Sequence, residues 1–222
     1  MRNHSPLRPV HPFPAQGLYV ITRDSGGARS SLIDEVKSAL HGGAGVVQYR
    51  AKSGRGSLDE ALALRAICHE LGAPLIINDD VAMALEMGAD GVHLGREDDA
   101  IASARQRLGP DAIIGVSCYN DLNRAIEAQQ AGATYVAFGR FFPSTTKPNA
   151  PCASLETLRQ AKRQLMVPIV AIGGITRANG SELVGAGADI LAVIEGVFGN
   201  KSPESAAREF RALWGDLALN PS

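Results

Sequence analysis

Two carboxylates follow an apolar run without a spacer in the stretch PLIINDD, where Asp79 and Asp80 come directly after Asn78. Charges at the end of an apolar strand are costly unless they are solvated, paired or bound to a cation. Helix capping explains Asp80, because aspartate is favoured at the N-cap and a helical pattern starts just after it. The stretch HLGREDD repeats the arrangement, and capping explains its Asp99 in the same way. Asp79 and Asp98 then form a pair of candidate Mg²⁺ ligands.

Polar donors follow another apolar run, in the stretch QYRAK. Gln48, Arg50 and Lys52 are two residues apart, so in an extended chain they point to the same side. Three converging donors suit a polyanion, and arginine offers a planar fork to phosphate oxygens. A strand that runs out into solvent would also carry Arg and Lys, so this stretch alone leaves both interpretations open. Together with Asn78 and the acidic pair it favours a Mg²⁺-pyrophosphate site.

Small polar groups end three further apolar runs. The segment GRFFPSTTKPNAPCAS is long, and long loops in compact domains are often functional, although a solvated polar loop is the alternative. The paired glycines before Ile175 would let a phosphate approach backbone N–H groups, or would simply make a tight turn. The candidate side chains and backbone groups in these three places are Ser117, Ser144, Thr145, Thr146, Lys147 and Gly174.

A recurring Gly-Ala step organises the chain behind these residues. It precedes an apolar run at Ala44, Ala89, Ala133 and Ala188, at intervals of 45, 44 and 55 residues. Glycine there suits the end of a helix followed by immediate entry into a buried strand. Four more apolar runs lie between these segments, namely GLYVIT, PLIIN, AIIGVS and PIVAIGG. The sequence therefore predicts eight strands.

Most of the intervening segments have helical spacing of apolar residues, as at Ala61, Leu64 and Cys68. Strands that alternate with helices imply parallel pairing, and eight such units predict one α/β domain, a closed (β/α)8 TIM barrel over residues 17–218. An open doubly wound sheet is the alternative, but no glycine-rich dinucleotide fingerprint follows the first strand. Barrel active sites lie where strands end and βα loops begin, which is where the candidate residues fall.

The composition limits the classes of partner and the cellular compartment that we expect. The 222 residues carry a formal charge of −1, with 45% hydrophobic and 20% charged residues, so we expect neither nucleic acid nor a membrane as a partner. The three cysteines show no CxxC pair or zinc pattern, which favours reduced thiols in a cytoplasmic protein. Residues 1–16 are rich in proline and polar residues, and we expect a flexible tail there rather than a signal peptide. The sequence sets no oligomeric state.

These motifs resemble the thiamine-phosphate synthase family, also called thiamine-phosphate pyrophosphorylase. The resemblance runs from about Gly17 to Phe198 and rests on QYRAK, IINDD, GADGVHLGREDD, IIGVS, FPSTTKP, VAIGGI and GADILAVI, in that order. It implies the (β/α)8 fold and the joining of hydroxymethylpyrimidine pyrophosphate to hydroxyethylthiazole phosphate, or its carboxylated form, with Mg²⁺ as cofactor. The products would be thiamine phosphate and pyrophosphate.

The resemblance also implies roles for individual residues. Asp79 and Asp98 would hold Mg²⁺. The pyrimidine substrate would be bound by Gln48, Arg50, Lys52, Asn78, Ser117 and Lys147, of which Arg50, Lys52, Ser117 and Lys147 would be catalytic. The thiazole phosphate would be bound by Ser144, Thr145, Thr146, Gly174, Ile194 and Glu195. Glu195 stands where the family commonly has Ser, and it can serve if that position acts through its backbone N–H.

Three rival functions remain on the same barrel. A thiazole tautomerase would keep the Gly-Gly phosphate site without needing the whole Mg²⁺ and pyrophosphate set. A non-catalytic regulator that binds thiazole phosphate would have no need for the two acids. A generic phosphate-binding isomerase would need a poised general acid and base, and no obvious pair stands at the strand ends. The complete polar set favours the transferase, acting by a dissociative mechanism.

Overall fold

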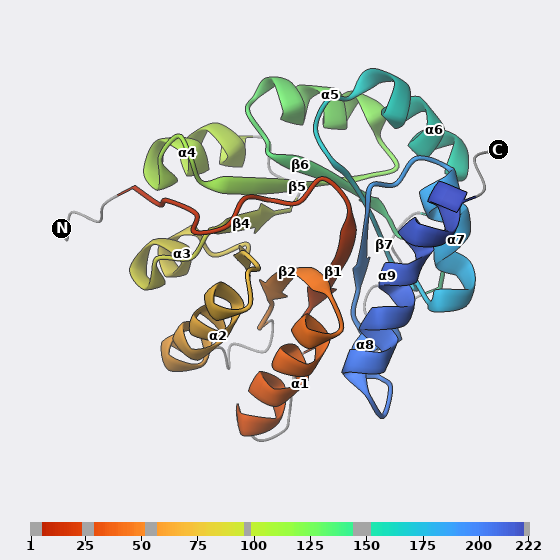
Figure 1. Ribbon diagram of the computed structural model, residues 1–222. Helices are drawn as coiled ribbons and strands as arrows, with labels where there is room; N and C mark the ends of the chain where they lie inside the picture. The colour runs from red at the N-terminus through yellow and green to blue at the C-terminus, as the bar shows by residue number, and fades with distance from the viewer. Residues whose placement is uncertain (1–5, 24–28, 52–56, 96–98, 144–151, 220–222) are drawn as a thin grey trace.

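Eight parallel strands close into a barrel in the order β1 to β8, each paired with the next and β8 with β1 (Figure 1). The computed structural model describes residues 6–23, 29–51, 57–95, 99–143 and 152–219. The predicted single (β/α)8 barrel and its eight strands are confirmed. The strands are β1 (Gly17–Ile21), β2 (Ala44–Tyr49), β3 (Leu75–Asn78), β4 (Gly91–Leu94), β5 (Ile113–Tyr119), β6 (Tyr135–Gly139), β7 (Ile169–Ile172) and β8 (Ile190–Val193).

Helices surround the barrel, and α9 lies beside α1 where the chain closes the ring (Figure 1). They are α1 (Arg29–His41), α2 (Leu58–Glu70), α3 (Val81–Met87), α4 (Asp99–Leu108), α5 (Leu122–Gln130), α6 (Leu155–Gln164), α7 (Arg177–Gly185), α8 (Glu195–Phe198) and α9 (Pro203–Leu219). The predicted cap at Asp80 is confirmed, since its carboxylate accepts the Met83 N–H at 2.8 Å. Helix α4 begins at Asp99 itself, one residue earlier than a capping role requires.

Alternate residues of the strands face two different cores. One lies between the sheet and the helices, and the other fills the barrel interior. The interior core is formed by Tyr19, Ile21, Val46, Ile76, Ile113, Tyr135, Ala137, Val170, Ile190 and Ala192. Side chains two residues apart on a strand point to the same face. The polar residues at the carboxyl ends of the strands that continue this spacing therefore also face the barrel interior.

In three of the four repeats, the residue after the Gly-Ala step forms hydrogen bonds to the preceding strand. Asp90, Thr134 and Asp189 occupy this position in three of the four repeats. Their side chains accept the N–H groups of Leu75, Ile114 and Ile169 on the preceding strand, at 2.8, 3.0 and 3.0 Å. The backbone N–H groups of Asp90, Thr134 and Asp189 donate back to the carbonyls of the same three residues. The repeat therefore ties each of these strands to its neighbour.

Residues 6–16 cross the amino-terminal end of the barrel before the chain enters β1 (Figure 1). Leu7 is buried, and its N–H donates to the Leu108 carbonyl at 2.7 Å. Val10 N–H donates to Asp90 Oδ1 at 2.8 Å, and His11 Nε2 lies 3.0 Å from the His69 carbonyl oxygen. We call this packed segment the arm.

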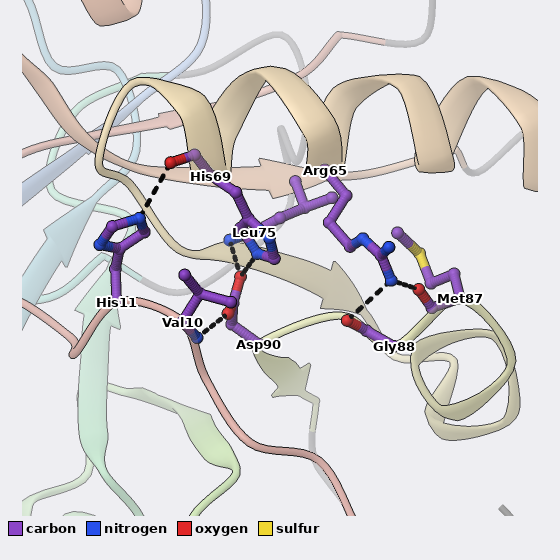
Figure 2. A network of polar contacts seen from close by, with 8 residues as sticks. All are labelled: Val10, His11, Arg65, His69, Leu75, Met87, Gly88 and Asp90. Carbon is purple, nitrogen blue, oxygen red and sulfur yellow. Dashed lines mark hydrogen bonds and ion pairs between the residues drawn. The ribbon is translucent and has the colours of Figure 1, made fainter.

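Asp90 is the centre of the contacts under the arm (Figure 2). It is fully buried, and its second oxygen accepts the Leu75 N–H and lies 2.8 Å from His69 Nε2. Nearby, Arg65 donates to the carbonyls of Met87 and Gly88 at the end of α3. Asp90 thus connects the arm, helix α2 and the start of β3.

The arm differs from the flexible tail expected over residues 1–16. The composition of this segment is that of a loose chain, but Leu7 and Phe13 are apolar anchors that bury against the barrel. Residues 1–5 lie outside the described part of the chain. Among the described residues, no helix has both the length and the apolar character needed to cross a lipid bilayer.

Candidate active site

A cavity of about 730 Å³ opens at the carboxyl ends of the strands. It is the kind of site that (β/α)8 barrels place at this end. Eight residues selected from the sequence line it, namely Gln48, Arg50, Asn78, Asp79, Ser117, Gly174, Ile194 and Glu195. The other six, Lys52, Asp98, Ser144, Thr145, Thr146 and Lys147, lie outside the described residues.

Arg50 is positioned by its backbone at the end of β2. Its N–H donates to Thr22 Oγ1 at 2.9 Å, and the Thr22 hydroxyl lies 3.3 Å from the Arg50 carbonyl oxygen. Thr22 is fully buried, so this reciprocal bond fixes the chain where it leaves the barrel. The Arg50 side chain is partly exposed and lines the cavity, where a guanidinium can meet an anion.

Asp79 has an unusual backbone conformation beside the cavity. Its φ is 61°, in the left-handed region that few residues other than glycine adopt. Its N–H donates to the His93 carbonyl at 2.8 Å, and Asn78 Nδ2 donates to Asp79 Oδ2 at 2.7 Å. Asp79 lines the cavity, whereas the next residue, Asp80, caps helix α3. Strain of this kind is concentrated at functional sites.

Asp79 fits the chemistry of a Mg²⁺ ligand, because it is an exposed carboxylate at the mouth of the cavity with an amide beside it. No cluster of three or more His, Cys, Asp or Glu side chains occurs within the described residues. Such a cluster is not required, since Mg²⁺ usually takes one or two carboxylates, waters and phosphate oxygens. Its expected partner Asp98 lies outside the described part of the chain.

Ser117 ends a chain of buried polar groups that the sequence did not reveal. His93 Nε2 lies 2.9 Å from Ser117 Oγ, and His93 Nδ1 lies 3.0 Å from the Tyr135 hydroxyl. Tyr135 in turn lies 2.9 Å from the Tyr19 hydroxyl, which accepts from Gln48 Nε2 at 2.7 Å. This polar chain, from Gln48 to Ser117, spans the cavity floor and joins two of the predicted site residues.

The two tyrosines of the polar chain are fully enclosed. Burial raises the pKa of Tyr19 and Tyr135 well above the usual value for a phenol, because a phenolate would lose its hydration. Gly115 makes room for one of them, since a Cβ there would lie 2.0 Å from Tyr135 Cζ. A side chain on β5 at this point would therefore displace the Tyr135 ring.

Tyr19, His93 and Tyr135 were missed because each lies inside a run that reads as an ordinary apolar strand. The signal that could have found them is alternation. Counting back in steps of two from Ile21 reaches Tyr19, and counting forward in steps of two from Gly91 reaches His93. Both lie on the interior side of the barrel.

The paired glycines after β7 pack against the start of the β6 loop. Gly173 and Gly174 have φ values of 104° and 65°, and a Cβ on Gly174 would lie 2.4 Å from the Pro143 carbonyl oxygen. Phe142 N–H donates to the Gly173 carbonyl at 3.0 Å. Close backbone approach is thus a reason for glycine here, beside the phosphate contact suggested by the sequence.

Ile194 and Glu195 form the opposite wall of the cavity, at the start of the short helix α8. The Ile194 side chain is partly buried against the barrel interior, and its carbonyl accepts the N–H groups of Val197 and Phe198. The Glu195 side chain is exposed, with a carboxylate oxygen close to Gly199, the residue after α8. Both Glu195 and Gly199 line the cavity.

Comparison with known proteins decides the family. A family model described as thiamine monophosphate synthase matches residues 18–197. The chain belongs to the thiamine monophosphate synthase family. It is 51% identical over 207 residues to the thiamine-phosphate synthase of Methylococcus capsulatus, covering 91% of both chains. It is 53% identical over 198 residues to that of Nitrosococcus oceani, covering 88% of this chain and 91% of the relative.

A solved structure of similar sequence has the same architecture. The thiamine phosphate pyrophosphorylase from Pyrococcus furiosus matches with a TM-score of 0.80 and 35% identity, over 91% of this chain and 97% of that one. The resemblance drawn from the motifs is confirmed at the level of the thiamine monophosphate synthase family.

Proposed function

We propose that this protein joins hydroxymethylpyrimidine pyrophosphate to hydroxyethylthiazole phosphate, or its carboxylated form, giving thiamine phosphate and pyrophosphate. The observation that carries the proposal is the family match over residues 18–197, taken with a cavity lined by Arg50, Asp79 and Ser117 at one end of the barrel. The relatives reported above are named for this activity. The protein is then a transferase of thiamine biosynthesis.

The reaction needs a site that accepts the growing negative charge of a leaving pyrophosphate. The carbon–oxygen bond of the pyrimidine substrate breaks, and both electrons leave with pyrophosphate. Arg50, together with Lys52 and Lys147, stabilises the negative charge that grows on this group. Mg²⁺, held by Asp79 and Asp98, would supply further positive charge there when bound. Asn78 supports Asp79 through the amide bond to its carboxylate.

The carbon left behind is a methylene cation, stabilised by the electron-rich aminopyrimidine. The thiazole nitrogen captures it by forming the new carbon–nitrogen bond, so no protein nucleophile is required. What the protein must do is orient both substrates and exclude water, which would trap the cation. Gln48 and Ser117 hold the pyrimidine, and the apolar side chains Ile21, Val170 and Ile172 form a dry wall beside it.

The second substrate occupies the opposite wall. We assign its phosphate to the backbone at Gly174, Ile194 and Glu195, with the hydroxyls of Ser144, Thr145 and Thr146 from the β6 loop. A backbone role suits Glu195 better than a side-chain role, because a carboxylate repels a phosphate. The three cysteines are free, which supports a reducing compartment, and we place the enzyme in the cytoplasm.

The test is to mix the purified protein with both substrates and Mg²⁺ and to follow thiamine phosphate by oxidation to fluorescent thiochrome. We expect product with Mg²⁺ and a large loss with EDTA. A matched pair of variants locates the metal role, because Asp79→Asn and Asp80→Asn each remove one charge from neighbouring residues. Asn caps a helix as well as Asp, so Asp80→Asn should stay active while Asp79→Asn loses about 100-fold or more.

A folded protein that binds thiazole phosphate without forming product would contradict the proposal. A tautomerase or a non-catalytic regulator would then lead. Equal activity of Asp79→Asn and the parent protein would contradict the metal assignment alone. Isothermal titration of thiazole phosphate separates these cases, because binding of that substrate does not depend on turnover.

A further inference from the structure

The polar chain on the cavity floor has a direction. Gln48 Nε2 donates to the Tyr19 oxygen, so the single hydroxyl hydrogen of Tyr19 is available for the Tyr135 oxygen, 2.9 Å away. Tyr135 accepts this hydrogen and has its own to give to His93 Nδ1, 3.0 Å away. An imidazole that accepts at Nδ1 carries its hydrogen on Nε2, which then donates to Ser117 Oγ at 2.9 Å.

Both tyrosines keep their hydroxyl hydrogens, which this sequence of donors and acceptors requires. Tyr19 and Tyr135 are fully buried, and the loss of hydration raises the pKa of both well above the usual value. Each tyrosine can therefore donate one hydrogen bond, and the two donations must run in the same sense. The opposite sense would need the Gln48 amide oxygen at Tyr19, and would make Ser117 donate to His93.

We propose that Tyr19, Tyr135 and His93 are positioning residues for Ser117. The two tyrosines set the tautomer of His93, so that its Nε2–H donates to Ser117 Oγ. The Ser117 hydrogen is then available for a ligand. When Nε2–H donates to Ser117 Oγ, the Ser117 hydrogen is not used by His93 and is available on the side of the cavity that Ser117 lines. Gln48 sets the sense of the chain at the far end. This inference extends the proposed function, in which Ser117 binds the pyrimidine.

The order of donors matches what the site has to bind. Pyrimidine ring nitrogens and pyrophosphate oxygens are acceptors, so a Ser117 hydroxyl whose hydrogen is not used by His93 can donate to them, whereas one that donates to His93 cannot. The arrangement is set before a ligand arrives, which is the form of preorganisation that lowers the cost of binding. Ring contacts support it, since the His93 and Tyr135 rings stack at 5.6 Å and an interplanar angle of 22°.

The first experiment reads the tautomer directly, without substrates. Nuclear magnetic resonance of the protein with ¹⁵N-labelled histidine distinguishes a protonated ring nitrogen from a bare one, and His93→Gln identifies the His93 signals by their loss. We expect hydrogen on Nε2 and a bare Nδ1. Hydrogen on Nδ1 would overturn the proposal. Because no turnover is involved, this result stands even if the protein proves to lack the proposed activity.

A pair of tyrosine variants tests the cause of the tautomer. Tyr135→Phe keeps the ring but removes the hydroxyl that donates to Nδ1, so we expect the second tautomer to become populated. Tyr49→Phe is the matched control, because the Tyr49 hydroxyl donates to Glu60 on the outer side of the barrel. An unchanged His93 tautomer in Tyr135→Phe would overturn the proposal.

Kinetics then test the consequence at Ser117. His93→Gln and His93→Met introduce side chains of similar length and volume, but only Gln can donate from the place of Nε2. We expect His93→Met to lower kcat/KM for the pyrimidine substrate about 10-fold or more, and His93→Gln to recover much of this loss. The two variants should be equal in a Ser117→Ala background. A difference that persists there would overturn the proposed role.

Discussion

Phe13 and Tyr135 stack face to face, with ring centroids 4.1 Å apart and ring planes 2° from parallel. One ring belongs to the arm at the amino-terminal end of the barrel, and the other has its hydroxyl in the polar chain of the cavity floor. The support of the active site therefore extends through the whole depth of the barrel. Phe13 also meets Tyr19 edge to face, at a centroid distance of 6.2 Å.

Replacing Phe13 by Ala should destabilise the protein and disturb the site above it. We expect the free energy of unfolding to fall by about 3 kcal/mol, because apolar burial and the ring stack are lost. We also expect kcat/KM to fall, because the Tyr135 ring loses the packing that holds it in place. Urea denaturation and the thiochrome assay measure the two effects. Val10→Ala is the control on the same arm, because Val10 is 59% exposed and should change stability by less than about 0.5 kcal/mol.

Asp90→Ala should release the arm. It removes the acceptor of the Val10 and Leu75 N–H groups in a fully buried place, so we expect a loss of about 3 kcal/mol or more. Limited proteolysis should then cut the chain within residues 6–16 much faster than in the parent protein. Asp189→Ala removes the equivalent acceptor just before β8 without touching the arm, and should leave that rate of cleavage unchanged.

Asp79→Gly should separate stability from activity. Glycine adopts a φ of 61° without strain, so we expect stability to be kept or raised by up to about 1 kcal/mol. The lost carboxylate should nevertheless lower activity about 100-fold or more, if Asp79 acts as proposed. Thermal unfolding and the thiochrome assay on one sample decide this. A large fall in stability would show that the conformation of Asp79 depends on its side chain.

Gly115→Ala should be poorly tolerated, although it adds only a methyl group. The new Cβ would lie 2.0 Å from Tyr135 Cζ, inside a closed barrel where neither strand can move freely. We expect a loss of about 3 kcal/mol. Gly185→Ala, near the end of α7, is the contrast, since a Cβ there meets nothing within 4 Å and should be neutral or slightly stabilising. Urea denaturation of the two variants compares them directly.

The buried phenols predict an alkaline limit to stability. The pKa of Tyr19 is raised in the folded state, so the unfolded chain loses that proton first. The contribution is complete below about pH 10, the usual pKa of a phenol, and the free energy of unfolding should fall by about 1.4 kcal/mol per pH unit per buried group above it. Tyr19→Phe should reduce this slope by about that amount. A slope identical to that of the parent protein would contradict the assignment.

The fold could be predicted because the local signals agree with one another. Each Gly-Ala step ends a helix and starts a strand, and Gly43, Gly88, Gly132 and Gly187 all have positive φ values as expected. The arm could not be predicted, because its composition is polar and rich in proline. Leu7 and Phe13 are anchors only when the barrel offers them a surface, which is tertiary information.

The candidate site also contains residues that the sequence predicts and residues that it does not. Arg50, Asp79 and Ser117 stand at strand ends, where a polar residue after an apolar run is visible in the sequence, and all three line the cavity. Tyr135 and His93 lie within strands, and their role depends on which face of each strand points inward. That choice is set by the register of the closed sheet, which no single segment encodes.

In three of the four Gly-Ala repeats, a pair of hydrogen bonds joins the repeat to the strand before it. The side chain of Asp90, Thr134 or Asp189 accepts one bond, and the backbone N–H of the same residue donates the other. The barrel is thus assembled from two-strand modules. The first pair of strands, β1 and β2, has Gly45 at the corresponding position, and a Cβ there would lie 3.7 Å from Pro14 Cγ of the arm. The β1–β2 pair, which has no side-chain acceptor at this position, is therefore covered there by the incoming chain.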